Sequence, residues 1–195
     1  MFIGAPDESA ADVAEWYEQQ RASWGYLPNY APAFGRRTDV ANAWNQLNGA
    51  IRGGMDRRRY EVATIAAARA LRSTYCMAAH CKFLRDQCED ETTMRTIAAD
   101  PSGATLDATD RAVMDFAAQV ATDASAVTAA DVDRLRALGL DDDDVAAVVF
   151  AAAARAFFTK VLDGLGVQAD EQLGATFDPE VRRQVTVGRP IATSS

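Results

Sequence analysis

One long stretch of the chain constrains the fold more than any other feature. From Arg57 to Glu89 the sequence runs for 33 residues without a glycine or a proline. Globular helices usually span about 8 to 20 residues, so we expect a break inside this stretch. Ser73 and Thr74 are the best candidates, because their hydroxyls can cap free amides and neither residue favours a helix interior. The stretch therefore predicts two consecutive helices, with Asp56 capping the first and Cys76 in the first turn of the second.

The rest of the chain also shows helical periodicity, and no segment alternates convincingly between apolar and polar residues. The predicted fold class is therefore all-α. Residues 23–35, SWGYLPNYAPAFG, are predicted to form a long aromatic loop that packs onto the core. A helix is predicted over Ser9 to Gln20, and a second runs from a Thr38 cap to Gly53 with an apolar stripe of Val40, Trp44, Leu47 and Ile51. Three more are predicted: one within Leu106 to Val120, one after a capping box at Thr128 to Asp131, and one from the acidic run Asp141 to Asp144 as far as Gly164.

The length of 195 residues falls within the range of a single domain. We expect one domain over residues 1–195, with its core at about 20–168, a C-terminal tail at 169–195 and a short helix after Asp178. The most apolar run, Val145 to Ala154, stops at Arg155 and is shorter than the ~20 residues that cross a bilayer. This run therefore predicts a core helix, and no membrane partner is expected.

The charge balance excludes an ordinary nucleic-acid-binding surface, because 28 Asp and Glu residues outweigh 20 Lys and Arg residues for a net charge of −8. The N-terminal MFIGAPDESAADV lacks the basic start and long apolar run of a secretory signal, so a cytoplasmic protein is expected. Three cysteines without a spaced framework, in a compartment that keeps thiols reduced, predict no structural disulfides.

The segment RSTYCMAAHC, residues 72–81, holds two of the three cysteines and the only histidine. On a helix, Cys76 and His80 are one turn apart, with their β-carbons roughly 5–6 Å from each other. First-turn amides, the positive end of the helix dipole, the imidazole and the Ser73 hydroxyl could together favour a Cys76 thiolate. The alternative is that Cys76 and Cys81 are small buried hydrophobes and that His80 is a satisfied core polar group.

Neither of the other cysteines is placed to resolve an oxidised Cys76. Cys81 lies about 140° around the helix from Cys76, and Cys88 lies roughly 18 Å along it. A zinc site built from Cys76, His80 and one further ligand lacks a second spaced Cys/His pair, so no metal is predicted. Glu61, an acid before an apolar run, is either a buried carboxylate or a solvated first-turn acid, and periodicity favours the solvated position.

The order and spacing of Glu61, Ser73, Cys76 and His80 resemble the pattern of the alkyl hydroperoxidase D and carboxymuconolactone decarboxylase family. That pattern is a glutamate, eleven residues, a cysteine, two residues, a cysteine, three residues and a histidine. Tyr75 resembles the peroxidase-related branch, as do the segments WGYLPNYAPAF, LDATDRAVMDFAAQV and LRALGLDDDDVAAVV. The resemblance spans roughly residues 20–168 and is fairly specific when the pieces are taken together.

The resemblance implies an all-helical, AhpD-like bundle that assembles as a homo-oligomer, commonly a trimer or hexamer. It also implies peroxide chemistry, in which the cysteine matching Cys76 is oxidised to a sulfenic acid while His80 and Glu61 form a proton relay. Ser73 occupies the place of the first motif cysteine, which takes part in relay and disulfide formation, and the family's usual glycine after the histidine is also missing, near Gln87. Because serine cannot form a disulfide, we expect a one-cysteine peroxidase that an external thiol regenerates, with no cofactor.

Two other functions stay open at this point. The protein could be a lyase resembling carboxymuconolactone decarboxylase, with His80 as general acid or base and Cys76 as part of the pocket wall. It could also be a non-catalytic oligomeric protein that binds a small molecule. In each case the expected ligand is a small molecule, which for the peroxidase is a hydroperoxide.

Overall fold

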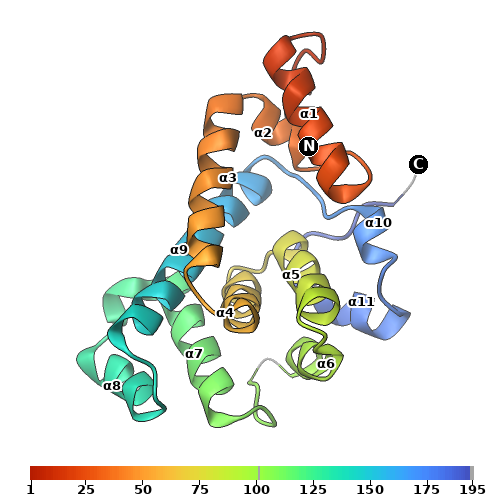
Figure 1. Ribbon diagram of the computed structural model, residues 1–195. Coiled ribbons are helices and arrows are strands. Elements are labelled where there is room, and N and C mark those ends of the chain that lie inside the picture. Colours follow the sequence, from red (N-terminus) through yellow and green to blue (C-terminus); the bar gives the residue numbers. More distant parts are fainter. Residues whose placement is uncertain (101, 194–195) are drawn as a thin grey trace.

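The computed structural model describes residues 1–100 and 102–193, so the remaining three positions of the predicted domain lie outside the described part. Within these ranges the regular structure consists of α-helices and one short 3-10 turn, which confirms the all-α prediction (Figure 1). The elements are α1 (Ala11–Trp24), α2 (Ala31–Gly35), α3 (Thr38–Gly53), α4 (Arg57–Ala70), α5 (Thr74–Gln87), α6 (Glu91–Ala99), α7 (Ala108–Asp123), η1 (Ala124–Ala126), α8 (Ala129–Ala137), α9 (Asp142–Gly164), α10 (Glu171–Gly174) and α11 (Pro179–Val185).

Helix α4 lies at the centre of the fold, where Figure 1 shows it almost end-on between α5 and α7. It packs against α5, α7 and α9, and every residue from Tyr60 to Ala68 is buried. Alanine at positions 63 and 66–68 keeps the helix narrow, so neighbours can approach it on several sides. Because neighbours cover this helix on all sides, hydrophobic periodicity does not indicate which residues are exposed. The sequence favoured a solvated Glu61, but Glu61 is buried.

The predicted break in the long stretch is confirmed. Helix α4 ends at Ala70 and α5 begins at Thr74, with Arg72 at a φ of +57° where the chain reverses. Asp56 caps α4 as predicted, since its carboxylate accepts a hydrogen bond from the amide of Arg59 at 2.8 Å. Ser73 is the N-cap residue of α5 in backbone conformation, but its side chain makes no capping hydrogen bond. Cys76 consequently sits in the first turn of α5, as the sequence predicts.

The N-terminal region differs from the prediction: helix α2 lies within the predicted aromatic loop, which is irregular only between α1 and α2, and the ends of α1 and α3 are shifted. Helix α1 starts two residues later than expected and runs four residues further, to a left-handed Gly25. Thr38 does not cap α3: the N-cap residue is Arg37, and the Thr38 hydroxyl donates to Asp12 of α1 at 2.6 Å. Of the predicted stripe on α3, Trp44 is buried but Leu47 is 54% exposed, because α9 covers only part of that face.

Helix α9 begins at the predicted acidic run, where Asp141 and Asp144 form a capping box, and it ends at Gly164. It is long and apolar enough to cross a membrane by length and composition, and half of its most apolar window is buried inside the protein. Core helices of globular proteins meet the same description. Here the buried face packs on α4 and α7 and carries the charged residue Arg155 into the interior.

The C-terminal segment is part of the core and not a loose tail. The predicted helix after Asp178 is confirmed as α11, whose N-terminal amides Asp178 caps. Leu173, Val185 and Ile191 are buried in the main apolar cluster. Asp170 is buried as well and accepts hydrogen bonds from the amide of Asn29, at 2.6 Å, and from the hydroxyl of Tyr75. This carboxylate ties the segment to the aromatic loop and to the start of α5.

Candidate active site

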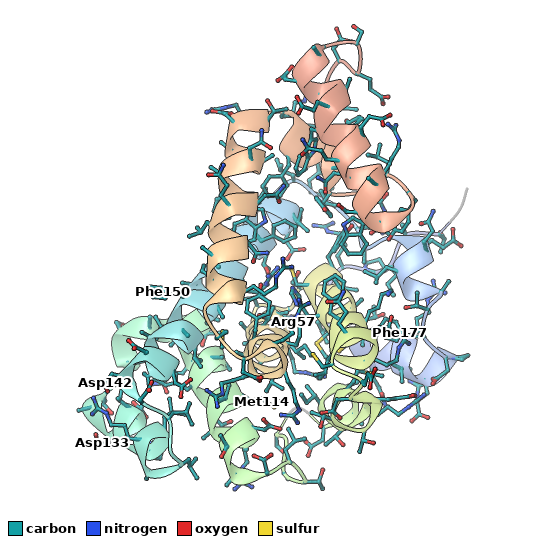
Figure 2. All side chains as sticks on the ribbon, in the orientation of Figure 1. Arg57, Met114, Asp133, Asp142, Phe150 and Phe177 are labelled. Atoms are coloured by element: carbon teal, nitrogen blue, oxygen red, sulfur yellow. The ribbon has the colours of Figure 1, made fainter. Side chains whose placement is uncertain are left out.

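A cavity of about 560 Å³ opens between α3, α4, α5 and α9, with the aromatic loop and α10 at its edge. Three of the four predicted site residues, Glu61, Cys76 and His80, line it. Arg57 lines it too, and Figure 2 shows this side chain in the middle of the molecule, where α3, α4 and α5 come together. The fold therefore places Cys76 and His80 of α5 and Glu61 of α4 on the wall of one cavity.

The sulfur of Cys76 is contacted by two donors from α9. The Thr159 hydroxyl donates to Sγ at 3.5 Å, and Nη1 of Arg155 donates to it at 3.7 Å. Cys76 also lies in the first turn of α5, where free amides and the helix dipole favour a negative charge. The side chain is 1% exposed, yet it forms part of the cavity wall. The sulfur thus lies beside a hydroxyl donor, a guanidinium and the positive end of a helix dipole.

Arg155 is the charged centre of the site. It is 3% exposed, donates from Nη2 to the Tyr60 hydroxyl at 3.3 Å and lies over the rings of Trp44 and Phe158. Burial lowers the pKa of Arg155, but Cys76, Tyr60 and Glu61 outweigh this effect and the pKa is raised overall. No carboxylate in the described part of the chain forms an ion pair with it. A buried cation is costly unless an anion accompanies it, and the Cys76 sulfur is the acidic group in contact.

Glu61 and His80 form a second, adjoining unit. His80 Nδ1 lies 2.5 Å from Glu61 Oε2, and Glu61 Oε1 forms an ion pair with Arg57 at 2.7 Å. If Nδ1 of a neutral imidazole carries the proton, it donates a hydrogen bond to the Glu61 carboxylate. Nε2 is then left as a hydrogen-bond acceptor. Although His80 and Cys76 both line the cavity, no hydrogen bond joins the two side chains, so the expected direct pair is not formed.

His80 is neutral in the folded protein at pH 7. Burial lowers the pKa of His80 to about 4, the nearby charge of Arg155 adds to this effect, and Glu61 opposes it only in part. At neutral pH the imidazole is therefore uncharged and does not hold a proton taken from Cys76. The fixed cation beside the sulfur is Arg155, a residue that sequence reasoning missed. The available signal was an arginine that interrupts the most apolar run of the chain.

The remaining sulfur and hydroxyl groups take structural positions. Ser73 is buried and its hydroxyl has no hydrogen-bond partner, so it does not donate to Cys76 as expected; Thr159 does. Cys81 is fully buried, and burial raises the pKa of its thiol to about 12. Cys88 is half-buried, and all three cysteines are free. The zinc alternative would need a third ligand, and within residues 1–100 and 102–193 no group of three His, Cys, Asp or Glu side chains lies together.

The charge state of His80 can be tested directly, because the chain contains one histidine and its imidazole signals are unambiguous. In an NMR titration of the folded protein we expect His80 to stay neutral from pH 8 down to pH 5 and to titrate near pH 4. The unfolded chain takes up this proton near pH 6.5, so stability should fall as the pH drops from about 6.5 to 4. A midpoint at or above 6.5 in the folded protein would contradict this assignment.

Comparisons with known proteins identify one matching family model and several structures with the same fold. Residues 38–101 match the model of the carboxymuconolactone decarboxylase family. No curated protein sequence matches the chain. The fold is similar to an alkylhydroperoxidase AhpD core, a peroxidase-related protein from Ralstonia eutropha JMP134, with a TM-score of 0.78 and 22% identity over 88% of this chain and 93% of that chain.

Two further structures show the same fold. A peroxidase-related protein from Silicibacter sp. TM1040 has a TM-score of 0.78 and 19% identity over 88% of this chain and 93% of that chain. The debrominase Bmp8 has a TM-score of 0.70 and 14% identity over 93% of this chain and 96% of that chain. Glu61, Ser73, Cys76 and His80 all fall inside the segment that matches the family model. The chain therefore has an AhpD-like fold, and its residues 38–101 match the model of the carboxymuconolactone decarboxylase family.

Proposed function

We propose that the protein is a thiol-dependent peroxidase, which reduces an organic hydroperoxide through Cys76 and is regenerated by an external thiol. One observation carries this proposal: the Cys76 sulfur lies on the wall of the cavity in contact with a buried guanidinium that has no carboxylate partner among the described residues. An inert core cysteine needs neither a place on a cavity wall nor a neighbouring cation. A nucleophilic thiolate needs both.

In the first half-reaction the Cys76 thiolate attacks the distal oxygen of R–O–O–H. A sulfur–oxygen bond forms, the oxygen–oxygen bond breaks, and His80 Nε2 takes the proton of the distal oxygen and passes it to the departing R–O⁻. The products are an alcohol and the sulfenic acid of Cys76, held as its sulfenate by Arg155. The charge next to Arg155 is the same before and after the step, so the fixed guanidinium stabilises the negative charge throughout.

Glu61 and Arg57 position the imidazole for this transfer. The carboxylate accepts a hydrogen bond from Nδ1–H, which leaves the Nε2 lone pair for the peroxide, and the contact with Arg57 at 2.7 Å fixes the position of the carboxylate. Because His80 is neutral at pH 7, it can accept a proton without first losing one. The pair is the orienting unit of the relay that the family resemblance implies.

The second half-reaction requires an external thiol. Two molecules of R′SH convert the sulfenate to thiolate: the first forms a mixed disulfide with Cys76, the second releases R′S–SR′, and the oxygen leaves as water. Ser73 cannot supply a resolving sulfur, and Cys81 is fully buried. This arrangement supports a one-cysteine cycle rather than an internal disulfide.

The runner-up function is a lyase in which the His80–Glu61 pair transfers a proton to or from a carbon acid. The short Nδ1–Oε2 contact would suit that reaction as well. The fold itself does not decide, because a debrominase shares it with peroxidase-related proteins. The contact between Arg155 and the Cys76 sulfur favours the peroxidase, since a lyase or a non-catalytic binding protein gives it no role.

The proposed function is tested by trapping the oxidised sulfur. After mild treatment with cumene hydroperoxide, we expect a dimedone adduct on Cys76 by mass spectrometry, and consumption of the peroxide when a thiol is present. Cys76→Ser should abolish both, whereas the matched control Cys88→Ser should retain both. Peroxide loss that persists in Cys76→Ser, or the absence of an adduct in the folded wild-type protein, would refute the peroxidase. A lyase would instead retain its activity in Cys76→Ala and lose it in His80→Ala.

The role of Arg155 predicts a change in the reactivity of the thiol. In a Cys88→Ser background, Arg155→Met should slow alkylation of Cys76 by iodoacetamide at pH 7 by about tenfold or more, because the thiolate loses its neighbouring cation. Arg155→Lys, which keeps the charge, should restore part of the rate. Methionine fills a similar volume, so thermal unfolding should show a folded variant. Equal alkylation rates in the wild type and in a folded Arg155→Met would show that the guanidinium does not activate the sulfur.

We also propose that the protein assembles as a homo-oligomer, a trimer or hexamer, through the outer face of α9. Phe150 and Phe157 are 59% and 43% exposed on this helix, and Leu47 of the adjoining α3 is 54% exposed. Figure 2 shows Phe150 on the outer side of α9. Large exposed apolar side chains that gather on one surface are typical of an interface.

The assembly proposal predicts that Phe150→Glu combined with Phe157→Glu gives a monomer. Size-exclusion chromatography with light scattering should report a multiple of the 21.0 kDa chain for the wild type and the single mass for the variant. Arg21→Glu, a charge reversal on α1, is the matched control and should leave the assembly intact. A wild-type protein that is monomeric at micromolar concentration would contradict the proposal.

A further inference from the structure

We propose that the substrate is an organic anion: a hydroperoxide with an apolar or aromatic body and a carboxylate or similar group at its other end. This inference rests on the proposed peroxidase and names its substrate class. Three properties of the cavity support it, namely its size, its aromatic walls and its excess of positive charge. The volume, most of the aromatic wall and the rim cation Arg52 are features that the sulfur chemistry itself does not use.

The cavity is too large for hydrogen peroxide alone. Its volume of about 560 Å³ falls in the range of sites for whole organic ligands, roughly 300–1,000 Å³. A water molecule occupies only about 30 Å³ in the liquid, and hydrogen peroxide is not much larger. The reacting O–O group would therefore fill a small part of the space next to Cys76. The remaining space accommodates the organic part of a hydroperoxide.

Aromatic rings form much of the wall beyond the sulfur. The ring of Trp24 contacts Tyr30 edge-to-face, with centroids 6.2 Å apart, and Phe83 in a tilted arrangement, with centroids 5.7 Å apart. Phe158 contacts Tyr30 at 5.5 Å and continues this surface toward Arg155. All four rings line the cavity. Walls of this kind bind an apolar body, and favour a planar one that can stack or meet the ring edges.

The charged residues of the wall are mainly basic, although the chain as a whole carries a net charge of −8. Arg52, Arg57, Lys82 and Arg155 line the cavity, against Glu61 as the acid. A concave, partly apolar site with one sign of charge concentrates ligands of the opposite sign. The basic wall of this cavity therefore contrasts with the acidic balance of the chain as a whole.

Three of the four cations already have partners. Arg57 is paired with Glu61, Lys82 with Asp86 at 2.7 Å, and Arg155 with the Cys76 sulfur. Arg52 lies exposed near the end of α3, and it has no ion pair with any residue that the structure describes. It is thus the cation free to bind an anionic group at the rim. The hydroperoxide end would lie at Cys76, and the apolar body would cover the aromatic wall between them.

A matched pair of hydroperoxides tests this inference: 4-(2-hydroperoxypropan-2-yl)benzoate and its methyl ester, which differ in charge but share the reacting group and the ring. With the full-length protein, the rate of Cys76 oxidation should be about tenfold higher for the acid than for the ester. The preference should shrink as the salt concentration rises. Arg52→Gln should lower the rate for the acid toward that of the ester.

Arg183→Gln is the matched control, because Arg183 is an exposed arginine of α11 that does not line the cavity. It should leave the preference for the acid unchanged. Equal rates for acid and ester, or a preference that survives in Arg52→Gln, would overturn the inference while leaving the peroxidase intact. Failure of both compounds and of cumene hydroperoxide to oxidise Cys76 would instead overturn the proposed function.

Discussion

The buried charge of Arg155 is the interaction on which the site depends. A guanidinium buried in the core beside the stacked rings of Trp44 and Phe158 is costly unless a negative charge or hydrogen-bond acceptors accompany it. The structure supplies the Cys76 sulfur at 3.7 Å and the Tyr60 hydroxyl at 3.3 Å. The contact that accompanies the buried Arg155 is thus the same contact on which the proposed activation of Cys76 depends. The helix dipole of α5 and the Thr159 hydroxyl act in the same direction.

The proposed mechanism assigns charge stabilisation and proton transfer to different residues. In it the permanent charge of Arg155 stabilises the Cys76 thiolate, so His80 does not have to be protonated. The imidazole is kept neutral by burial and by that same guanidinium, while Glu61 fixes which nitrogen carries the proton. This division explains how one histidine can stay available as a base without forming a direct hydrogen bond to the cysteine.

Local chemistry was predictable from the sequence, whereas the contacts between distant helices were not. The break at Ser73, the Asp56 cap and the position of Cys76 follow from residues within a few places of one another. Periodicity favours an exposed Glu61, and this prediction is wrong because α4 is covered on all sides and has no polar face. Arg155 lies 79 residues from Cys76, and no spacing rule joins them. Conversely, Ser73 is close to Cys76 in sequence, but its hydroxyl makes no hydrogen bond to the Cys76 sulfur.

The proposed proton-transfer pair and the aromatic loop at the edge of the cavity lie in different parts of the chain. Glu61, Cys76 and His80 lie within residues 38–101, the segment that matches the family model. The aromatic loop and Arg155 lie outside it, and Asp170 holds that loop against the start of α5 through the Asn29 amide and the Tyr75 hydroxyl. A change in these flanking segments could alter the cavity wall without moving the proton-transfer pair. Proteins with this fold can therefore share a reactive centre and still accept different molecules, because the flanking helices set the shape and charge of the space above the sulfur.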